Sequence, residues 1–139
     1  RKIAPLNIED IAETFDLLGE WEERYAYLID LGRQLPALSD GERTAETQVR
    51  GCMSQVWLVG GVQANGTMQF KGDSDSTLVK GLIALLLVMV NGKTPAEISA
   101  MDIAETFRQL GLESHITVNR RNGFFAMVER IRALAALST

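Results

Sequence analysis

The sequence predicts an α+β fold in which a small antiparallel sheet of about three strands packs against helices. Three features predict it: amphipathic helical patterns at both ends of the chain, a strong β-hairpin signal before the middle, and a long apolar helix directly after that hairpin. A length of 139 residues fits one domain, so we expect a single domain over residues 1–139.

Two helices are expected before the sheet. Asn7 suits the N-cap of the first, because asparagine side chains accept hydrogen bonds from first-turn N–H groups. The second is expected over residues 21–31, with Gly32 as its C-terminal stop. Residues 34–43 are rich in turn-forming residues and predict a loop. The apolar residues of the first helix recur on one face at Ile8, Ile11, Phe15 and Leu18.

A β-hairpin is expected next. Residues 56–59 and 67–70 are rich in residues that favour strands. They flank the dipeptide Asn65-Gly66, which is typical of a two-residue type I′ turn.

A third strand and the facing of the sheet are also predicted. Residues 47–49 would add a short strand, which places Gly51 and Cys52 in the connection to the hairpin. Trp57 and Phe70 alternate with polar neighbours, so we expect both to face the core.

The longest helix is expected over about residues 74–90. Asp73 and Asp75 stand at its start and are expected to cap it and to complement its dipole. It is apolar nearly all round, which indicates a central buried helix. Gly81 lies inside it and indicates close packing at that point, because glycine otherwise destabilises a helix.

Three shorter patterns follow the central helix. Thr94 begins a capping box with proline at the first helical position. Residues 103–110 predict another helix, stopped by Gly111. Asn119 is expected to cap the last helix. Its inward residues are expected to be Phe124, Val128, Ile131 and Leu134.

Composition and charge exclude several classes of function. The formal net charge is −4, whereas nucleic-acid binding needs a basic face, so we expect no nucleic-acid partner. The longest apolar run covers residues 82–90, which is well short of the roughly 20 residues that span a membrane. We also find no pattern of a secretory signal peptide and expect a cytoplasmic protein.

Cysteine and histidine each occur once, at Cys52 and His115. One thiol can form no internal disulfide, and one copy of the chain cannot supply four thiolates to an iron–sulfur cluster. One histidine leaves almost nothing for a histidine-based metal site or a Ser-His-Asp triad. We therefore expect no bound metal and no cofactor.

The surroundings of Cys52 leave two interpretations open. Free cysteines are among the most buried residue types, so Cys52 can be an inert core residue. The alternative is a reactive thiol in a loop. Gly51 allows a backbone conformation that other residues rarely adopt, and the charge of Arg50 favours the nucleophilic thiolate.

The pattern around the cysteine decides between them. Residues 49–57 read V-R-G-C-M-S-Q-V-W and resemble the V-x-G-C-x-S-x-V-W signature of the SufE family of sulfur acceptor proteins, which includes a CsdE branch. Residues 119–123 read N-R-R-N-G where the family has S-R-S-Q-G, so only Arg120 and the glycine are kept. Three further blocks resemble the family, in its order: residues 21–36, 72–84 and 112–123.

The resemblance implies a SufE/NifU-like fold and a role in sulfur transfer. Members of the family receive sulfane sulfur as a persulfide on the matching cysteine, here Cys52. The donor is a cysteine desulfurase of the SufS or CsdA type, and the recipient is a downstream iron–sulfur scaffold. Pyridoxal phosphate belongs to the desulfurase, so this chain is expected to act as a carrier and activator rather than as a stand-alone enzyme. Both a monomer and a homodimer fit the sequence.

Together with Arg50 and Gly51, three further residues are candidates to support the cysteine or to contact the desulfurase. Asp73 has the partner contact as the alternative to its expected capping role. His115 is expected to be a structural or surface residue rather than an acid–base catalyst, because no nucleophile lies near it in the sequence. Arg120 is equally a first-turn surface charge or a residue that steers the thiol or binds the partner.

Three other functions are alternatives to that of a sulfur acceptor. A redox sensor or peroxidase would need a resolving thiol from another molecule. A cluster scaffold would need more ligands than one cysteine supplies. A desulfurase-binding module would stimulate its partner with no sulfur chemistry of its own.

Overall fold

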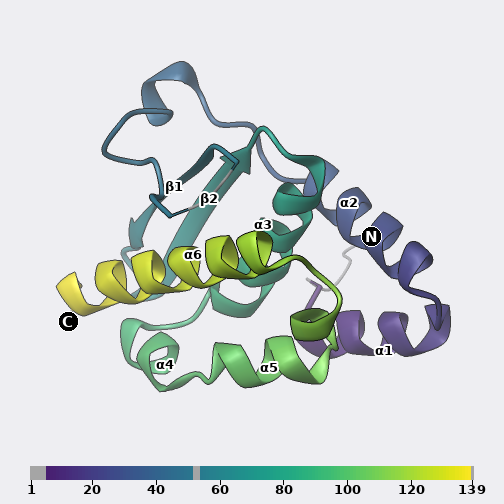
Figure 1. Ribbon diagram of the computed structural model, residues 1–139. Coiled ribbons are helices and arrows are strands. Elements are labelled where there is room, and N and C mark those ends of the chain that lie inside the picture. The colour runs from purple at the N-terminus through teal and green to yellow at the C-terminus, as the bar shows by residue number, and fades with distance from the viewer. Residues whose placement is uncertain (1–5, 52–53, 139) are drawn as a thin grey trace, which may run out of the picture.

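The computed structural model describes residues 6–51 and 54–138 and has the expected α+β architecture (Figure 1). Cys52 and Met53 lie outside the described residues. The two strands form an antiparallel sheet, and the helix after them, α3, contacts β2, α1, α2 and α6. The elements in chain order are α1 (Ile8–Leu18), α2 (Trp21–Arg33), the 3₁₀ turn η1 (Asp40–Glu42), β1 (Val56–Val62), β2 (Met68–Ser74), α3 (Thr77–Val90), α4 (Pro95–Ala100), α5 (Ile103–Gln109), the 3₁₀ turn η2 (Leu112–Ser114) and α6 (Val118–Leu137).

Helix α1 begins where the sequence predicts, because Asn7 and Asp10 form a capping box. Helix α2 runs past the expected stop at Gly32 and ends at Arg33. The reason is packing: a Cβ atom on Gly32 would lie 2.6 Å from the backbone nitrogen of Gly81 in α3. Gly32 is therefore a contact point between two helices rather than a helix terminator.

The close packing expected at Gly81 is confirmed. A Cβ atom there would lie 2.5 Å from the carbonyl oxygen of Leu28 in α2. Gly32 and Gly81 thus allow the backbones of α2 and α3 to approach more closely than any larger residue would permit. All but four of the fourteen residues of α3 are buried, so it forms the centre of the core, as predicted.

The sheet has two strands in the described residues, and the expected third strand is reduced to one bridge between Gln48 and Trp57. The Val49 N–H donates to the Val56 carbonyl at 2.8 Å, and the Leu58 N–H donates to the Thr47 carbonyl at 2.9 Å. The ladder stops there because residues 44–47 form a turn, in which the Thr47 N–H donates to the Thr44 hydroxyl.

The hairpin forms as predicted, but its turn is not type I′. The Gly66 N–H donates to the Gln63 carbonyl at 2.9 Å, and the Gln63 N–H donates to the Thr67 carbonyl at 2.7 Å. Only Gly66 has a positive φ in this turn, at 86°, whereas type I′ needs two such residues. The Asn65 side chain instead accepts hydrogen bonds from Thr67, which stabilises a three-residue loop.

Strand register decides which aromatic residue faces the core. Phe70 is buried, as expected. Trp57 pairs with Asp73 and points to the opposite face from its buried neighbours Val56 and Leu58, so its expected core position is wrong. Alternation along a strand allows only one of two adjacent side chains to face the core, and the aliphatic ones do so here.

The boundaries of the later helices follow the caps. Helix α3 begins after Ser76, and α6 begins after Thr117, whose hydroxyl accepts from the Arg120 N–H at 3.3 Å. The predicted caps at Asp73 and Asn119 are therefore wrong. Helices α4 and α5 are confirmed, with Thr94 as the cap of α4.

Candidate functional site

The described residues on either side of Cys52 indicate how its loop is held. Gly51 has a φ of 90°, a conformation that favours glycine, as the sequence led us to expect. A Cβ atom on Gly51 would lie 3.7 Å from the Cβ of Ala126, so this end of the loop lies beside α6. The side chain of Arg50 is exposed to solvent.

The Cys52 loop has two stems: Val49 before it, here called the near stem, and Gln55 and Val56 after it, here called the far stem. Both stems are fixed by backbone hydrogen bonds. The Val49–Val56 hydrogen bond joins the two stems directly. On the far stem, Gln55 and Asp75 are joined twice: the Gln55 N–H donates to the Asp75 carboxylate at 3.1 Å, and the Asp75 N–H donates to the Gln55 carbonyl at 3.3 Å. Asp75 therefore holds the loop stem instead of capping α3, which corrects the predicted role.

A small depression lies next to Ser54, between the N-terminal halves of α3 and α6. Its lining is mostly apolar and includes Arg120. The eight residues that line it are Ser54, Val79, Leu82, Asn119, Arg120, Gly123, Phe124 and Met127. Two helices and the chain next to Cys52 thus converge on one small surface that combines apolar residues with a cation.

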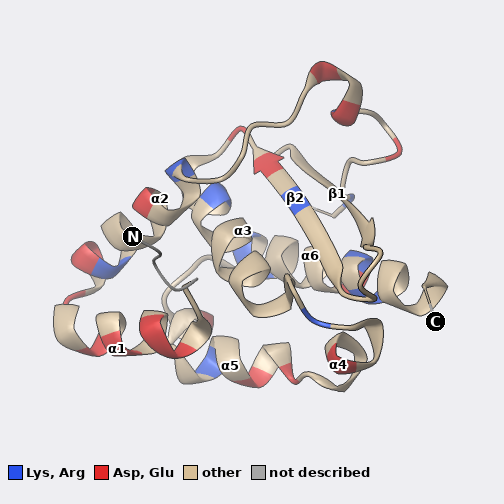
Figure 2. Ribbon diagram, turned by 180° about the vertical axis from the view of Figure 1, so that it is seen from behind, with Lys and Arg blue, Asp and Glu red and all other residues tan. Residues whose placement is uncertain are grey.

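The position of Arg120 is not explained by helix stability. The first turn of α6 has no acidic residue, whereas α1 and α2 carry the acidic residues that the helix dipole favours there (Figure 2). A cation in the first turn is electrostatically unfavourable. Arg120 is exposed to solvent, and the helix dipole does not account for a cation at this position.

Asp73 lies in β2 and is 8% exposed. Its carboxylate is 2.7 Å from Arg43 Nη2 and 3.6 Å from Lys80 Nζ, and it accepts the Ser74 N–H at 2.8 Å. Burial acts to raise the pKa of the Asp73 carboxyl, but the hydrogen bonds from Arg43 and Ser74 and the two cationic charges together lower it. Asp73 is thus an anion shared by two cations.

Arg43 and Lys80 are residues that the sequence analysis did not single out. Arg43 comes from the segment of residues 40–49, here called the strap, which leads from η1 to the near stem of the Cys52 loop. Lys80 comes from α3. The available signal was a lone lysine within an otherwise apolar helix, which indicates a charged partner nearby.

His115 is exposed but makes several contacts within the chain, as a structural or surface residue would. Its ring stacks on Trp21 with centroids 3.9 Å apart, and its Nδ1 lies 2.8 Å from the Gly111 carbonyl. The Tyr25 hydroxyl donates to the His115 carbonyl. These contacts join η2 to α2, and none of them involves Arg43, Asp73 or Arg120.

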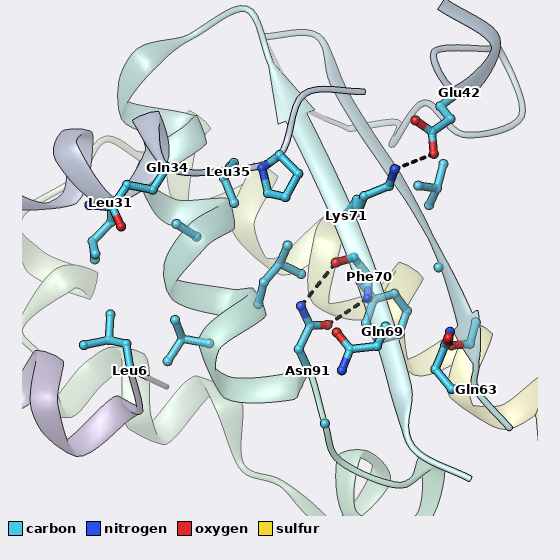
Figure 3. Close-up of a pocket in the computed structure, with 18 residues that line it drawn as sticks. Leu6, Leu31, Gln34, Leu35, Glu42, Gln63, Gln69, Phe70, Lys71 and Asn91 are labelled. Atoms are coloured by element: carbon cyan, nitrogen blue, oxygen red, sulfur yellow. Dashed lines mark hydrogen bonds and ion pairs between the residues drawn. The ribbon is translucent and has the colours of Figure 1, made fainter. Parts of the chain in front are cut away.

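A cavity of about 1060 Å³ lies along the edge of β2 that does not pair with β1 (Figure 3). Here the Asn91 side chain occupies the hydrogen-bonding groups of the strand edge: it accepts the Phe70 N–H at 2.8 Å and donates to the Phe70 carbonyl at 3.2 Å. Lys71 and Glu42 form an ion pair at 2.9 Å on the wall of the cavity. Its lining includes none of the sequence-predicted site residues.

Within residues 6–51 and 54–138, no group of three or more histidine, cysteine, aspartate or glutamate side chains is arranged to hold a metal ion. The same part of the chain has no helix that is long and apolar enough to cross a membrane.

Comparison with known proteins identifies the family. The family described as "SufE: Fe-S metabolism associated domain" matches residues 9–135. An uncharacterized SufE-like protein of Rhizobium etli is 44% identical over 129 residues, which cover 91% of this chain and 87% of that protein. Another, from Rhizobium meliloti, is 39% identical over 132 residues, which cover 93% of this chain and 94% of that protein.

A solved structure supports the fold. The solution structure of a hypothetical protein from Thermus thermophilus superposes with a TM-score of 0.78 and covers 98% of both chains, at 21% sequence identity. At that identity the likeness concerns architecture alone. On the family match and the two SufE-like relatives, this chain belongs to the SufE family, whose domain is associated with iron–sulfur metabolism.

Proposed function

We propose that this protein is the sulfur acceptor and activator of a cysteine desulfurase, and that Cys52 carries the sulfur as a persulfide. The observation that carries the proposal is the V-x-G-C-x-S-x-V-W block at residues 49–57 in a chain with a single thiol. The geometry around it supports a reactive loop. Gly51 has a left-handed backbone, and both stems are hydrogen-bonded in place.

The transfer is an exchange between a thiolate and a persulfide. The Cys52 thiolate attacks the outer sulfur of the desulfurase persulfide, a new sulfur–sulfur bond forms, and the old one breaks. The desulfurase cysteine leaves as a thiolate, so electrons balance and no external oxidant or reductant is required. Cleavage of the carbon–sulfur bond takes place earlier, on the pyridoxal phosphate of the desulfurase. This chain then needs no cofactor of its own.

The supporting residues have distinct proposed roles. Gly51 gives the loop its backbone conformation, and Arg50 and Arg120 supply positive charge that favours the thiolate or contacts an anionic group of the desulfurase. The apolar depression beside Ser54 is a shelter of suitable chemistry for the thiol between transfers. His115 has no part in the transfer. Because Asp73 is nearly buried, a supporting role within this chain suits it better than a partner contact.

We also propose a compartment, a sulfur donor and a sulfur recipient for this protein. The chain acts as one domain in the cytoplasm, takes sulfur from a desulfurase and delivers it to an iron–sulfur scaffold. The single thiol suits this role, because a second thiol nearby would resolve the persulfide into a disulfide.

The experiment is a mass measurement after incubation with a desulfurase and cysteine. The wild-type protein should gain a sulfur atom that a reductant removes, and Cys52→Ser should fold normally but gain none. Sulfur on the Ser variant would refute the assignment. Full stimulation of the desulfurase by the Ser variant would favour a pure binding module, and peroxide consumption without a desulfurase would favour a redox role.

A further inference from the structure

We propose that Asp73 is a positioning residue that, through Arg43, sets the geometry of both stems of the Cys52 loop. The inference rests on the proposed function of Cys52, and it assigns to the Arg43–Asp73–Lys80 cluster a role beyond holding the fold together. Three elements that are separate in the sequence meet at one nearly buried carboxylate: the strap, β2 and the first turns of α3.

Asp73 is connected to the strap through Arg43. The contact between Asp73 and Arg43 Nη2, at 2.7 Å, joins a nearly buried anion to a side chain that is 35% exposed. A charge-assisted hydrogen bond of this length is among the stronger polar contacts in a protein, and the guanidinium has a fixed planar geometry. Arg43 also lies 3.7 Å from the carboxylate of Asp40, but the Asp40 side chain is fully exposed, so the shorter contact with the nearly buried Asp73 is the one that fixes the position of Arg43.

Arg43 and its neighbours in the strap are connected in turn to the two stems of the Cys52 loop. Its guanidinium carbon lies 5.9 Å from the centre of the Trp57 ring, directly after the far stem at Val56. Along the strap, the Thr47 hydroxyl donates to the Glu42 carbonyl at 2.7 Å, and the Leu58 N–H donates to the Thr47 carbonyl. The near stem has a second anchor, because the Arg130 side chain of α6 donates to the carbonyls of Glu46 at 3.2 Å and Gln48 at 2.9 Å. A displacement of Arg43 is thus transmitted to the far stem through Trp57, and to the near stem through the Glu42–Thr47 hydrogen bond against this anchor.

Loss of the Asp73 carboxylate is expected to displace the strap. Asp73→Asn keeps the shape of the side chain but leaves Arg43 and Lys80 as neighbouring cations without an anion between them. Partly buried cations move toward water when they lose their counter-ion. Apart from Val49 the residues of the strap are exposed or half-buried, whereas most residues of α3 are buried, so the strap should move while α3 stays fixed in the core. The stems should loosen without global unfolding.

The test measures the alkylation rate of Cys52 by iodoacetamide in the intact free protein, well below its unfolding temperature. Asp73→Asn and Arg43→Gln should each raise the rate by at least about fivefold, the factor that corresponds to about 1 kcal/mol of local opening. The matched control is Glu42→Gln, which removes the Glu42–Lys71 ion pair of the same strap, 2.9 Å long, but leaves Arg43 and Asp73 in place. Its rate should stay within about twofold of the wild type.

A double variant separates positioning from general destabilisation. If Asp73 acts through Arg43, the Asp73→Asn/Arg43→Gln variant should react no faster than either single variant, because both remove the same connection. Rates of Asp73→Asn and Arg43→Gln within twofold of the wild type would overturn the proposal, as would multiplicative effects in the double variant. Alkylation needs no desulfurase, so this result is independent of whether Cys52 accepts sulfur, which the mass measurement decides.

Discussion

The α2–α3 interface and the strap are held by different kinds of contact. In the interface, Gly32 and Gly81 allow backbone to approach backbone, and the contact depends on shape. The strap arches away from the helices in Figure 1 and is held by ion pairs, by backbone hydrogen bonds and by two hydrogen bonds from the Arg130 side chain of α6, and Val49 at its end is its one buried residue. Shape-dependent packing cannot be released in part, whereas polar contacts can be lost one at a time. The rigid interface thus supports a segment that can change without unfolding.

The largest effect is expected from breaking the interface. Gly81→Ala would place a Cβ atom 2.5 Å from the Leu28 carbonyl oxygen, so α2 and α3 would have to separate. We expect a loss of about 3 kcal/mol in the free energy of unfolding, at the upper end of overpacking effects in cores. Urea unfolding measures it. The control is Gly61→Ala, where no atom lies within 4 Å of the added Cβ, and a loss as large in that variant would contradict the explanation.

An intermediate effect is expected at the point where the strap meets the core. Asp73→Asn should cost roughly 1–2 kcal/mol at neutral pH, less than a fully buried pair because Arg43 and Lys80 are each about one-third exposed. The pKa of the Asp73 carboxyl is lowered in the folded protein, so its ionised form stabilises the fold above the unfolded-state pKa of about 4. This contribution is lost as the pH falls through the lowered folded-state pKa.

The stabilisation by Asp73 is expected to depend on pH. The difference in unfolding free energy between the wild type and Asp73→Asn should be constant between pH 7 and about 5 and should shrink as the pH falls below about 4. Urea unfolding curves of both proteins across this range measure it. A difference that stays constant down to the acid limit would mean that the charge of Asp73 does not contribute.

The smallest effect is expected at the surface of the strap. Glu42 and Lys71 pair at 2.9 Å, but their side chains are 31% and 43% exposed, and such pairs add little to stability because water screens them. Glu42→Gln should therefore unfold at nearly the same urea concentration as the wild type. A loss comparable to that of Asp73→Asn would show that the whole strap, rather than the Arg43–Asp73 contact, is held as one unit.

Local signals in the sequence were enough for the fold class and most element positions. The Asn7 and Thr94 caps, the apolar run of α3 and the hairpin all have a cause within a few residues of themselves, so they can be read from one stretch of chain. The family block around Cys52 likewise lies in consecutive residues. Capping and periodicity are short-range effects, and a sequence records them directly.

The tertiary structure decided the features that depend on distant residues. The sequence predicts Gly32 as a helix stop, but in the structure it is the point where α2 contacts α3. The sequence also predicts Trp57 in the core, but the strand register places it on the opposite face from the core. Asp73 is predicted as a helix cap, but it lies within β2, which ends at Ser74. Its hydrogen-bond partner is Arg43, thirty residues earlier in the chain. Backbone proximity, strand register and the pairing of buried charges are properties of two segments at once, so neither segment alone can specify them.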